Sequence, residues 1–324
     1  MVGGSLVRAA ACGLVFLLAG CATRGPLLPQ LTSEPVPRRV ELAETPFFPQ
    51  RDYQCGPAAL ATVLAASGVT VDADALVPEV YLPGRQGSLQ PELVAAARGR
   101  GRVPYVLPPR PEALVAQLAA GLPVLVMQKL GAGPWPGWHY AVLIGYDAAA
   151  DRFLLRSGTD ERLELSAARF LTTWDRAGRW AIVTLRPGQL PADPDLARYM
   201  GAAAGLEAVG RLDEAGLAYQ AAVRRWPGEA LPQLGLANLA YARGDLPGAE
   251  RGFRAAIRIA PGDVAARNNR AEVLLGLGCP ASARQEIKAA QALAGEGPLA
   301  REVAMSAERI RAAQGPDGPG CPPN

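Results

Sequence analysis

The spacing of hydrophobic residues divides the chain into two halves of different character. In the first half, helical spacing predicts helices over residues 57–67, 89–99 and 111–120. Short β-branched and apolar runs then predict strands at Val124–Met127, Tyr140–Tyr146, Phe153–Arg156 and Trp180–Leu185. Because helices precede strands, we expect residues 47–191 to form an α+β domain whose helical half packs on a small antiparallel sheet.

The second half is alanine-rich, has helical spacing throughout and repeats itself every 34 residues. The positions that keep this register are Gly210, Gly244 and Gly278; Ala215, Ala249 and Ala283; Ala222, Ala256 and Ala290; Tyr219, Phe253 and Ile287; and Pro227 with Pro261. The pattern resembles the tetratricopeptide repeat over residues 196–296, with Gly295 in place of a third proline. The resemblance implies an all-α domain over 192–314, closed by a capping helix at Pro298–Ala313, whose concave surface binds a peptide or protein partner.

The first twenty residues have the features of a signal peptide. One charged residue, Arg8, precedes the apolar stretch Ala9–Leu18, which is too short for a transmembrane helix of roughly 20 residues. The letters LAGC that follow resemble the lipobox of bacterial lipoproteins, which implies cleavage before Cys21 and attachment of lipid to its thiol. An ordinary secretory signal cut elsewhere and an uncleaved anchor are the alternatives.

Residues 21–46 are expected to form a lipidated, extended tether between the membrane and the first domain. They contain few large apolar residues and five prolines, at positions 26, 29, 35, 37 and 46. In a Gram-negative lipoprotein, Ala22 in place of an aspartate implies sorting to the outer membrane, facing the periplasm. The expected localisation is therefore the cell envelope, with the membrane bound through the N-terminal lipid.

Composition narrows the classes of function. Hydrophobic residues make up 49% and charged residues 19%, as in ordinary globular proteins. A net charge of +3 with scattered basic residues gives no support to nucleic-acid binding. With Cys12 in the signal peptide and Cys21 on the lipid, Cys279 and Cys321 could form a disulfide, which would leave Cys55 as a free thiol. The tail 315–324 is expected to be flexible.

Cys55 lies directly before Gly56 and Pro57, at the start of an apolar, alanine-rich run. Proline is favoured at the first helical position, so we expect Pro57 to begin a helix and Cys55 to lie at its cap. A helix N-terminus lowers the pKa of a thiol and would make Cys55 a thiolate-prone nucleophile. His139, the single histidine of the chain, begins a predicted strand. Each residue alone is more often structural, but together they favour a Cys–His pair.

Three blocks around these residues resemble the bacteriocin-processing, double-glycine-leader class of papain-like cysteine peptidases. The blocks are PQRDYQCGPAALATVLAASG, GSLQPELVAAARGRG and WHYAVLIGYDAAADRFLLRSG, and the resemblance covers about residues 45–190. It implies that Cys55 attacks a peptide carbonyl, that His139 acts as general base and then acid, and that Gln50 donates to the oxyanion. Gln50 lies five residues before the cysteine where six is usual, so Gln54 is the alternative donor. No metal or organic cofactor is implied.

Ser157 stands where this class has an aspartate on the strand after the histidine strand. A hairpin between the two predicted strands sets His139 opposite residues 157–159. Asp147 lies about 26 Å along the strand from His139 and is excluded, whereas Asp160 could reach back if the strand bulges. A serine hydroxyl can accept from the imidazole but cannot offset the imidazolium charge as a carboxylate does. A purely structural Ser157, with a backbone carbonyl orienting the ring, is the alternative.

These features predict a lipid-anchored, periplasm-facing cysteine peptidase. It would hydrolyse peptide bonds through a thioester acyl-enzyme, with the repeats docking a protein substrate or partner. Members of the class cut leader peptides after Gly-Gly, which makes such a peptide one candidate substrate and a protein captured by the repeats another. The alternatives are a catalytically decayed papain-like lipoprotein that binds peptides or assists assembly, and an acyltransferase or amidase that keeps the nucleophile.

Overall fold

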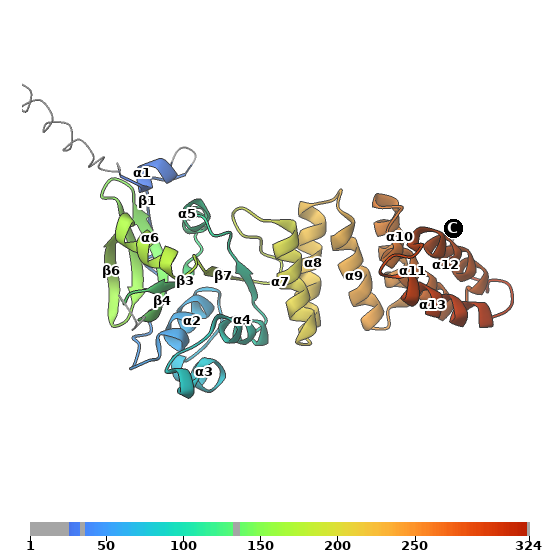
Figure 1. Ribbon diagram of the computed structural model, residues 1–324, viewed down its shortest axis with the longest axis horizontal. Coiled ribbons are helices and arrows are strands. Elements are labelled where there is room, and N and C mark those ends of the chain that lie inside the picture. Colours follow the sequence, from blue (N-terminus) through green and yellow to red (C-terminus); the bar gives the residue numbers. More distant parts are fainter. Residues whose placement is uncertain (1–25, 33–35, 132–136, 323–324) are drawn as a thin grey trace, which may run out of the picture.

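The computed structural model describes residues 26–32, 36–131 and 137–322. The expected signal peptide and Cys21 lie outside these residues. In the described part of the chain, a domain of sheet and helices is followed by a helical array (Figure 1). No helix in this part is long and apolar enough to cross a bilayer.

A seven-stranded antiparallel sheet forms the centre of the first domain. The strands are β1 (Arg39–Glu41), β2 (Val103–Val106), β3 (Val124–Lys129), β4 (Trp138–Asp147), β5 (Arg152–Ser157), β6 (Asp160–Ser166) and β7 (Ala181–Leu185). Their order is β2-β7-β3-β4-β5-β6, and β1 pairs with β4. The four predicted strands are confirmed as β3, β4, β5 and β7. The hydrophobic pattern did not predict the other three strands. β1 is very short, and β2 contains Pro104. β6 lies largely exposed at the edge of the sheet.

Helices cover both faces of this sheet. They are α1 (Leu28–Leu31), α2 (Cys55–Ala66), α3 (Ala73–Val80), α4 (Gln90–Gly99), α5 (Pro111–Ala119) and α6 (Ala167–Arg176). Side chains of α2, α3 and α4 form one hydrophobic cluster with the sheet, and those of α1, α5 and α6 belong to another. The two faces alternate along β3, where Leu125 joins the first cluster and Val124 and Val126 join the second.

The helix that carries Cys55 begins two residues earlier than predicted. α2 starts at Cys55 with Gln54 as its N-cap, so Pro57 occupies the third helical position and not the first. Because the first N–H groups of a helix have no intrahelical partner, proline fits anywhere in this turn. Cys55 is therefore part of the helix and not its cap.

The segment expected to be an extended tether is docked on the sheet domain at α1 and again at β1. Asp151 Oδ1 accepts hydrogen bonds from the backbone N–H groups of Leu27 and Leu28 at 3.0 and 2.8 Å. The Leu28 side chain is fully buried in the core, a burial that stabilises the fold by about 2 kcal/mol. The prediction that the sheet domain begins at Phe47, after an extended tether over residues 21–46, is therefore wrong, because described residues before Phe47 are part of the fold.

β1 is held against β4 by a close backbone approach at Gly145. The register pairs Arg39 with Asp147 and Glu41 with Gly145. A β-carbon at position 145 would lie 2.2 Å from Val40 O, so only glycine allows this approach. β4 consequently pairs with β3 along its first half, with β1 along its end, and with β5 on its other side.

The second domain is an array of helices packed in pairs (Figure 1). The helices are α7 (Leu196–Ala208), α8 (Leu212–Arg225), α9 (Ala230–Ala242), α10 (Leu246–Ile259), α11 (Val264–Gly276), α12 (Pro280–Ala294) and α13 (Ala300–Ala312). Gly210, Gly244 and Gly278 have φ of 76°, 77° and 77° at the turn inside each pair, a conformation that glycine adopts without strain. The repeated alanines and the aromatic or isoleucine positions are all buried. The predicted all-α tetratricopeptide fold is confirmed, and α13 lies where the capping helix was predicted.

The helical array shares a hydrophobic core with the sheet domain. The cluster on the α5 side of the sheet continues into α7, α8 and α9, where it includes Tyr199, Tyr219 and Leu239. Across the junction, Tyr105 Oη accepts a hydrogen bond from the backbone N–H of Asp195 at 3.0 Å. The first repeat is therefore packed on the sheet domain and does not hang from a linker.

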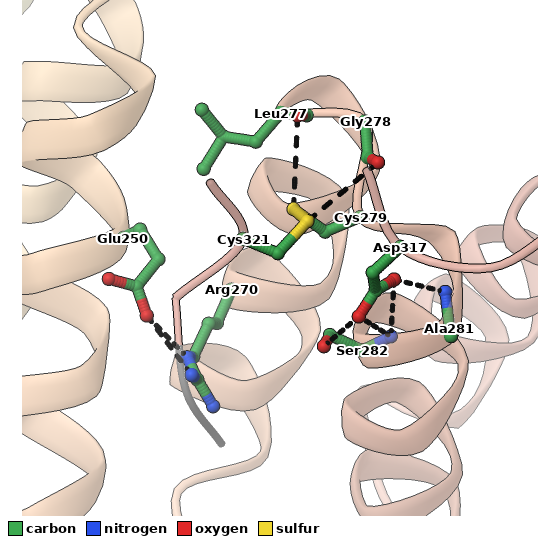
Figure 2. Close-up of a disulfide and its surroundings, with 9 residues drawn as sticks. All are labelled: Glu250, Arg270, Leu277, Gly278, Cys279, Ala281, Ser282, Asp317 and Cys321. Atoms are coloured by element: carbon green, nitrogen blue, oxygen red, sulfur yellow. Dashed lines mark hydrogen bonds and ion pairs between the residues drawn. A yellow bond between two sulfur atoms is a disulfide. The ribbon is translucent and has the colours of Figure 1, made fainter. Parts of the chain in front are cut away.

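The end of the chain is fixed to the last repeat, so the prediction of a flexible tail is wrong for its described residues. Cys321 forms a disulfide with Cys279, with the Cα atoms 5.7 Å apart. Asp317 Oδ1 accepts from the backbone N–H of Ala281 at 2.7 Å, and its Oδ2 accepts from the Ser282 hydroxyl at 2.5 Å (Figure 2). Cys279, the N-cap residue of α12, makes no side-chain capping bond. Asp317 thus caps α12 from outside the helix.

Buried charges join neighbouring repeats. The Arg270 guanidinium on α11 donates to Glu250 on α10 and to Glu286 on α12, and Figure 2 shows the Glu250 contact beside the disulfide. Removing one partner of such a pair leaves a buried charge uncompensated, at a cost of about 3–5 kcal/mol. The network therefore fixes how α10, α11 and α12 lie against one another.

Candidate active site

A cavity of about 810 Å³ opens where the N-terminus of α2 meets the start of β4. Both Cys55 and His139 line it. The other lining residues are Gln50, Tyr53, Arg85, Gln86, Gly87, Ser88, Leu89, Gln90, Met127, Gly137, Trp138 and Tyr140. The structure therefore brings the predicted nucleophile and the predicted base to one hollow, although 84 residues separate them along the chain (139 minus 55).

Cys55 is the first residue of α2 and carries the one free thiol among the described residues. The helix end is held by Gly56, where a β-carbon would lie 2.2 Å from Ser88 Oγ in the loop before α4. Glycine at this position lets the loop pass directly over the start of the helix. The block that begins at Ser88 in the sequence thus forms one wall of the site.

Burial raises the pKa of the Cys55 thiol above its ordinary value. The backbone N–H groups of Tyr140, Gly56 and Cys55 itself act in the opposite direction but are outweighed. The expectation of a thiolate-prone cysteine is therefore wrong for this arrangement. The helix N-terminus is present as predicted, and the loss of solvation is the larger effect.

His139 is the second residue of β4 and lies opposite Gln128 of β3. Its Nε2 is 2.9 Å from Ser157 Oγ, at the end of β5. In the tautomer with the proton on Nε2, the imidazole donates a hydrogen bond to Ser157. The lone pair on Nδ1 then remains free to accept a proton. Burial lowers the pKa of His139 below its ordinary value, so the ring is neutral and able to accept a proton near pH 7.

The placement of Ser157 beside His139 agrees with the hairpin register expected from the sequence. Asp160, the alternative, is exposed and pairs with Ser157 across the β5–β6 turn, with no hydrogen bond to His139 in the described structure. Asp147 lies at the far end of β4, where its Oδ1 accepts from Ala149 N–H at 2.9 Å. The catalytic role of Ser157 stays a prediction.

No hydrogen bond joins Cys55 to His139 among the described side chains, although both residues line the cavity. Catalytic pairs often reach hydrogen-bond distance only when substrate is bound. Proton transfer from the thiol to Nδ1 requires that approach. The raised pKa of Cys55 and the lowered pKa of His139 both favour a neutral thiol and a neutral imidazole over a preformed ion pair.

Of the two candidate oxyanion donors, Gln50 lines the cavity and Gln54 does not. The backbone N–H of Gln50 donates to Gly158 O at 3.1 Å, which ties the loop to the residue after Ser157. Its side-chain Oε1 is buried without a partner. Gln54 is instead the N-cap residue of α2. The geometry therefore favours Gln50, whose role stays a prediction.

Several lining residues had no signal in the sequence. Tyr140 donates through its hydroxyl to Ser88 O at 3.3 Å and presents its backbone N–H to the Cys55 sulfur. Arg85 comes from a turn that no pattern marked. Within the described residues, no three His, Cys, Asp or Glu side chains are grouped as metal ligands. The expectation of a cofactor-free site stays a prediction.

The sheet domain with this cavity has the arrangement of a papain-like cysteine peptidase. Its residues 42–182 match the family described as the Peptidase_C39 like family. The segment includes Gln50, Cys55, His139 and Ser157. The match covers less than half of the 324 residues and leaves the helical array outside.

Solved structures are similar to parts of the chain. A putative C39-like peptidase from Bacillus anthracis is 19% identical, with a TM-score of 0.40 over 46% of this chain and 98% of that chain. A double glycine motif protease from an AMS/PCAT transporter, in complex with the leader peptide, is 19% identical, with a TM-score of 0.35 over 44% and 91%. The Yersinia enterocolitica chaperone SycD, with a peptide of the translocator YopD, is 22% identical, with a TM-score of 0.34 over 36% and 92%. No curated protein matches the chain.

The raised pKa of Cys55 predicts slow alkylation at neutral pH. Iodoacetamide reacts with the thiolate, and a pKa above the ordinary value leaves less thiolate at pH 7 than in a model thiol. We expect the labelling rate of Cys55, followed by peptide mass spectrometry from pH 6 to 10, to stay below that of glutathione at pH 7. The pH at which the labelling rate of Cys55 reaches half of its maximum should lie above the ordinary pKa of a thiol. Labelling faster than glutathione at pH 7 would contradict this.

The Ser157 contact predicts how the pKa of His139 responds to substitution. His139 is the single histidine, so its imidazole resonance in tag-free protein is unambiguous. Its pKa should lie below the ordinary value because of burial. Ser157→Asp places a carboxylate on Nε2, favours the imidazolium and should raise this pKa by about 1 unit or more, whereas the uncharged Ser157→Asn should change it little. Equal titration of all three proteins would show that residue 157 does not contact the ring.

Proposed function

We propose that this protein is a cysteine peptidase that hydrolyses peptide bonds. The observation that carries the proposal is the convergence of the Cys55 thiol and the His139 imidazole on one cavity, at a helix N-terminus and a strand start. The match of residues 42–182 to a peptidase-like family supports the same class of reaction. The cavity, of about 810 Å³, has room for a segment of extended peptide.

In the proposed reaction, Cys55 Sγ attacks the peptide carbonyl carbon while its proton passes to His139 Nδ1. The carbonyl oxygen becomes an oxyanion, for which the Gln50 side-chain amide and the Cys55 backbone N–H are the candidate donors. The C–N bond then breaks, and the leaving amine takes the proton from His139. Water, deprotonated by the same imidazole, hydrolyses the thioester and regenerates the thiol.

The shifts in the pKa of Cys55 and of His139 favour one form of catalysis at this site. A raised pKa at Cys55 and a lowered pKa at His139 both favour the uncharged pair. The imidazole must therefore remove the proton as the sulfur attacks, in the manner of general-base catalysis. Ser157 fixes the ring through Nε2 but brings no charge to stabilise the imidazolium. We infer a slower acylation step than a carboxylate at position 157 would give.

The location of the enzyme is part of the proposal. A cleaved signal peptide and a lipid on Cys21 would place the sheet domain close to the outer membrane, on its periplasmic side. Two or three acyl chains suffice for stable anchoring, where one alone is marginal. Support comes from the LAGC sequence. The intact mass of the mature protein tests this proposal. An unmodified N-terminus at any residue other than Cys21 would contradict the proposed lipid anchor.

The helical array is proposed to dock a protein substrate or partner. Repeats of this kind present a concave surface made by one helix of each pair. Because the first repeat shares its core with the sheet domain, a chain bound in the array is held at a fixed place relative to the cavity. Capture by the array would raise the local concentration of the segment to be cut.

A catalytically decayed peptide-binding lipoprotein is the second candidate. Two observations favour it: a serine at the position of the usual carboxylate, and the absence of a Cys55–His139 hydrogen bond among the described side chains. An acyltransferase or amidase that keeps the nucleophile is the third. Transfer of the acyl group to an added amine separates it from a hydrolase.

Substitution of the proposed catalytic residues provides the test. Cys55→Ala should lower kcat on any cleaved peptide by at least about 10³-fold, because the nucleophile and its base act as a unit. Gln50→Ala should cost about 10²-fold, as loss of an oxyanion donor does, and the matched control Gln54→Ala should cost little. New protein termini in cell envelopes that appear only with intact Cys55 would identify the substrate. Activity that survives Cys55→Ala would overturn the proposal.

A further inference from the structure

Arg85 is held at the wall of the cavity by a tight turn. The 3₁₀ turn Pro83–Arg85 is closed by the backbone bond from Leu82 N–H to Gly87 O at 2.8 Å. Gln86, the next residue, has φ of 48°, in the left-handed region. A residue other than glycine in this conformation is costly and is kept only where the surroundings fix it. The turn therefore presents Arg85 and Gln86 to the cavity in a defined position.

The residues that line the cavity carry one sign of charge, although the carboxylate of Glu92 lies close enough to raise the pKa of the lining residue Tyr140. Arg85 is the one lining residue with a full positive charge, and no described lining residue is a carboxylate. In the described structure its guanidinium forms no hydrogen bond or ion pair with any residue. Lys129 lies at the edge, with Nζ 5.4 Å from the ring centre of Trp138, and it too has no carboxylate partner there. The nearby Arg51, by contrast, is paired with Asp74 at 3.0 Å.

A guanidinium without a partner in a concave site favours a bound anion. A carboxylate matches it best, because two N–H donors can meet two oxygens. The lining also contains uncharged polar side chains, such as Gln86 and Gln90, and the apolar side chains of Leu89, Met127 and Trp138, which offer contacts to neighbouring side chains of a peptide. The site thus combines one charged contact with a surface for an uncharged extended segment.

From these observations we propose that the cavity selects peptides with an aspartate or glutamate near the bond that is cut, and that Arg85 is the residue that recognises it. This inference rests on the proposed function, since it names the substrate class of the same site. A free C-terminal carboxylate has the same chemistry. The position of Arg85 on a wall of an open cavity is better suited to a side chain of a continuous peptide.

The test uses three pools of fluorogenic decapeptides with amidated C-termini. Each pool has Glu, Gln or Lys at one fixed central position and uncharged residues elsewhere. We expect kcat/KM for the Glu pool to exceed that for the Gln pool by about fivefold, as for a partly exposed charged contact, with the Lys pool slowest. The difference should shrink as salt is added.

Substitutions then assign the preference to one residue. Arg85→Gln should bring the Glu and Gln pools to equal rates, and Arg85→Glu should make the Lys pool the best. Arg51→Gln, an exposed arginine outside the cavity, should keep the preference for Glu. A preference that survives Arg85→Gln, or equal cleavage of all three pools by the unaltered protein, overturns the proposal. A Gln pool with free C-termini that outperforms the amidated Glu pool would assign the carboxylate to a chain end and overturn it as well.

Binding separates this inference from the proposed reaction. In Cys55→Ala protein, fluorescence anisotropy should show tighter binding of the Glu pool, and adding Arg85→Gln should remove the difference. If no pool is cleaved but this binding difference is found, the reaction fails and the acidic selectivity stands. If cleavage occurs without any charge dependence, the reaction stands and the selectivity fails. If neither cleavage nor binding depends on charge, the inference is wrong.

Discussion

The pairing of β4 with three other strands is the constraint on which the rest of the structure depends. β4 carries His139 at its beginning, and the turn that follows it supplies Asp151, which binds the backbone of Leu27 and Leu28. A strand of this length separates its two ends by about 30 Å. The site and the docked N-terminal segment are therefore held at opposite ends of one rigid element, and neither can shift along the sheet without breaking the ladder to β1, β3 or β5.

The site shows how burial can outweigh a favourable helix terminus. The N–H groups at the start of α2 favour a thiolate on Cys55, but the surrounding protein removes the water that would solvate it. The same burial keeps His139 neutral. A carboxylate near the ring would shift this balance toward the ion pair, whereas a serine keeps the geometry and leaves the charges unformed.

Local signals in the sequence predicted the features that depend on local periodicity. The 34-residue register gave the helical array, and the hairpin register placed Ser157 beside His139. The errors concern contacts with distant partners. Leu28 lies in a proline-rich segment that looks extended, but its burial in the core and its bond to Asp151, more than a hundred residues away, make it part of the fold. Asp317 likewise looks like part of a flexible tail until its bonds to the start of α12 are known.

The disulfide between Cys279 and Cys321 requires oxidising conditions, whereas the proposed role of Cys55 requires a reduced thiol. The proposed nucleophile must stay reduced, because oxidation to a sulfenic acid removes its reactivity. The disulfide must stay oxidised, since it holds the tail whose Asp317 caps α12. The intact molecule therefore exists within a window of redox potential. It is bounded on one side by oxidation of the thiol and on the other by reduction of the disulfide that holds the tail.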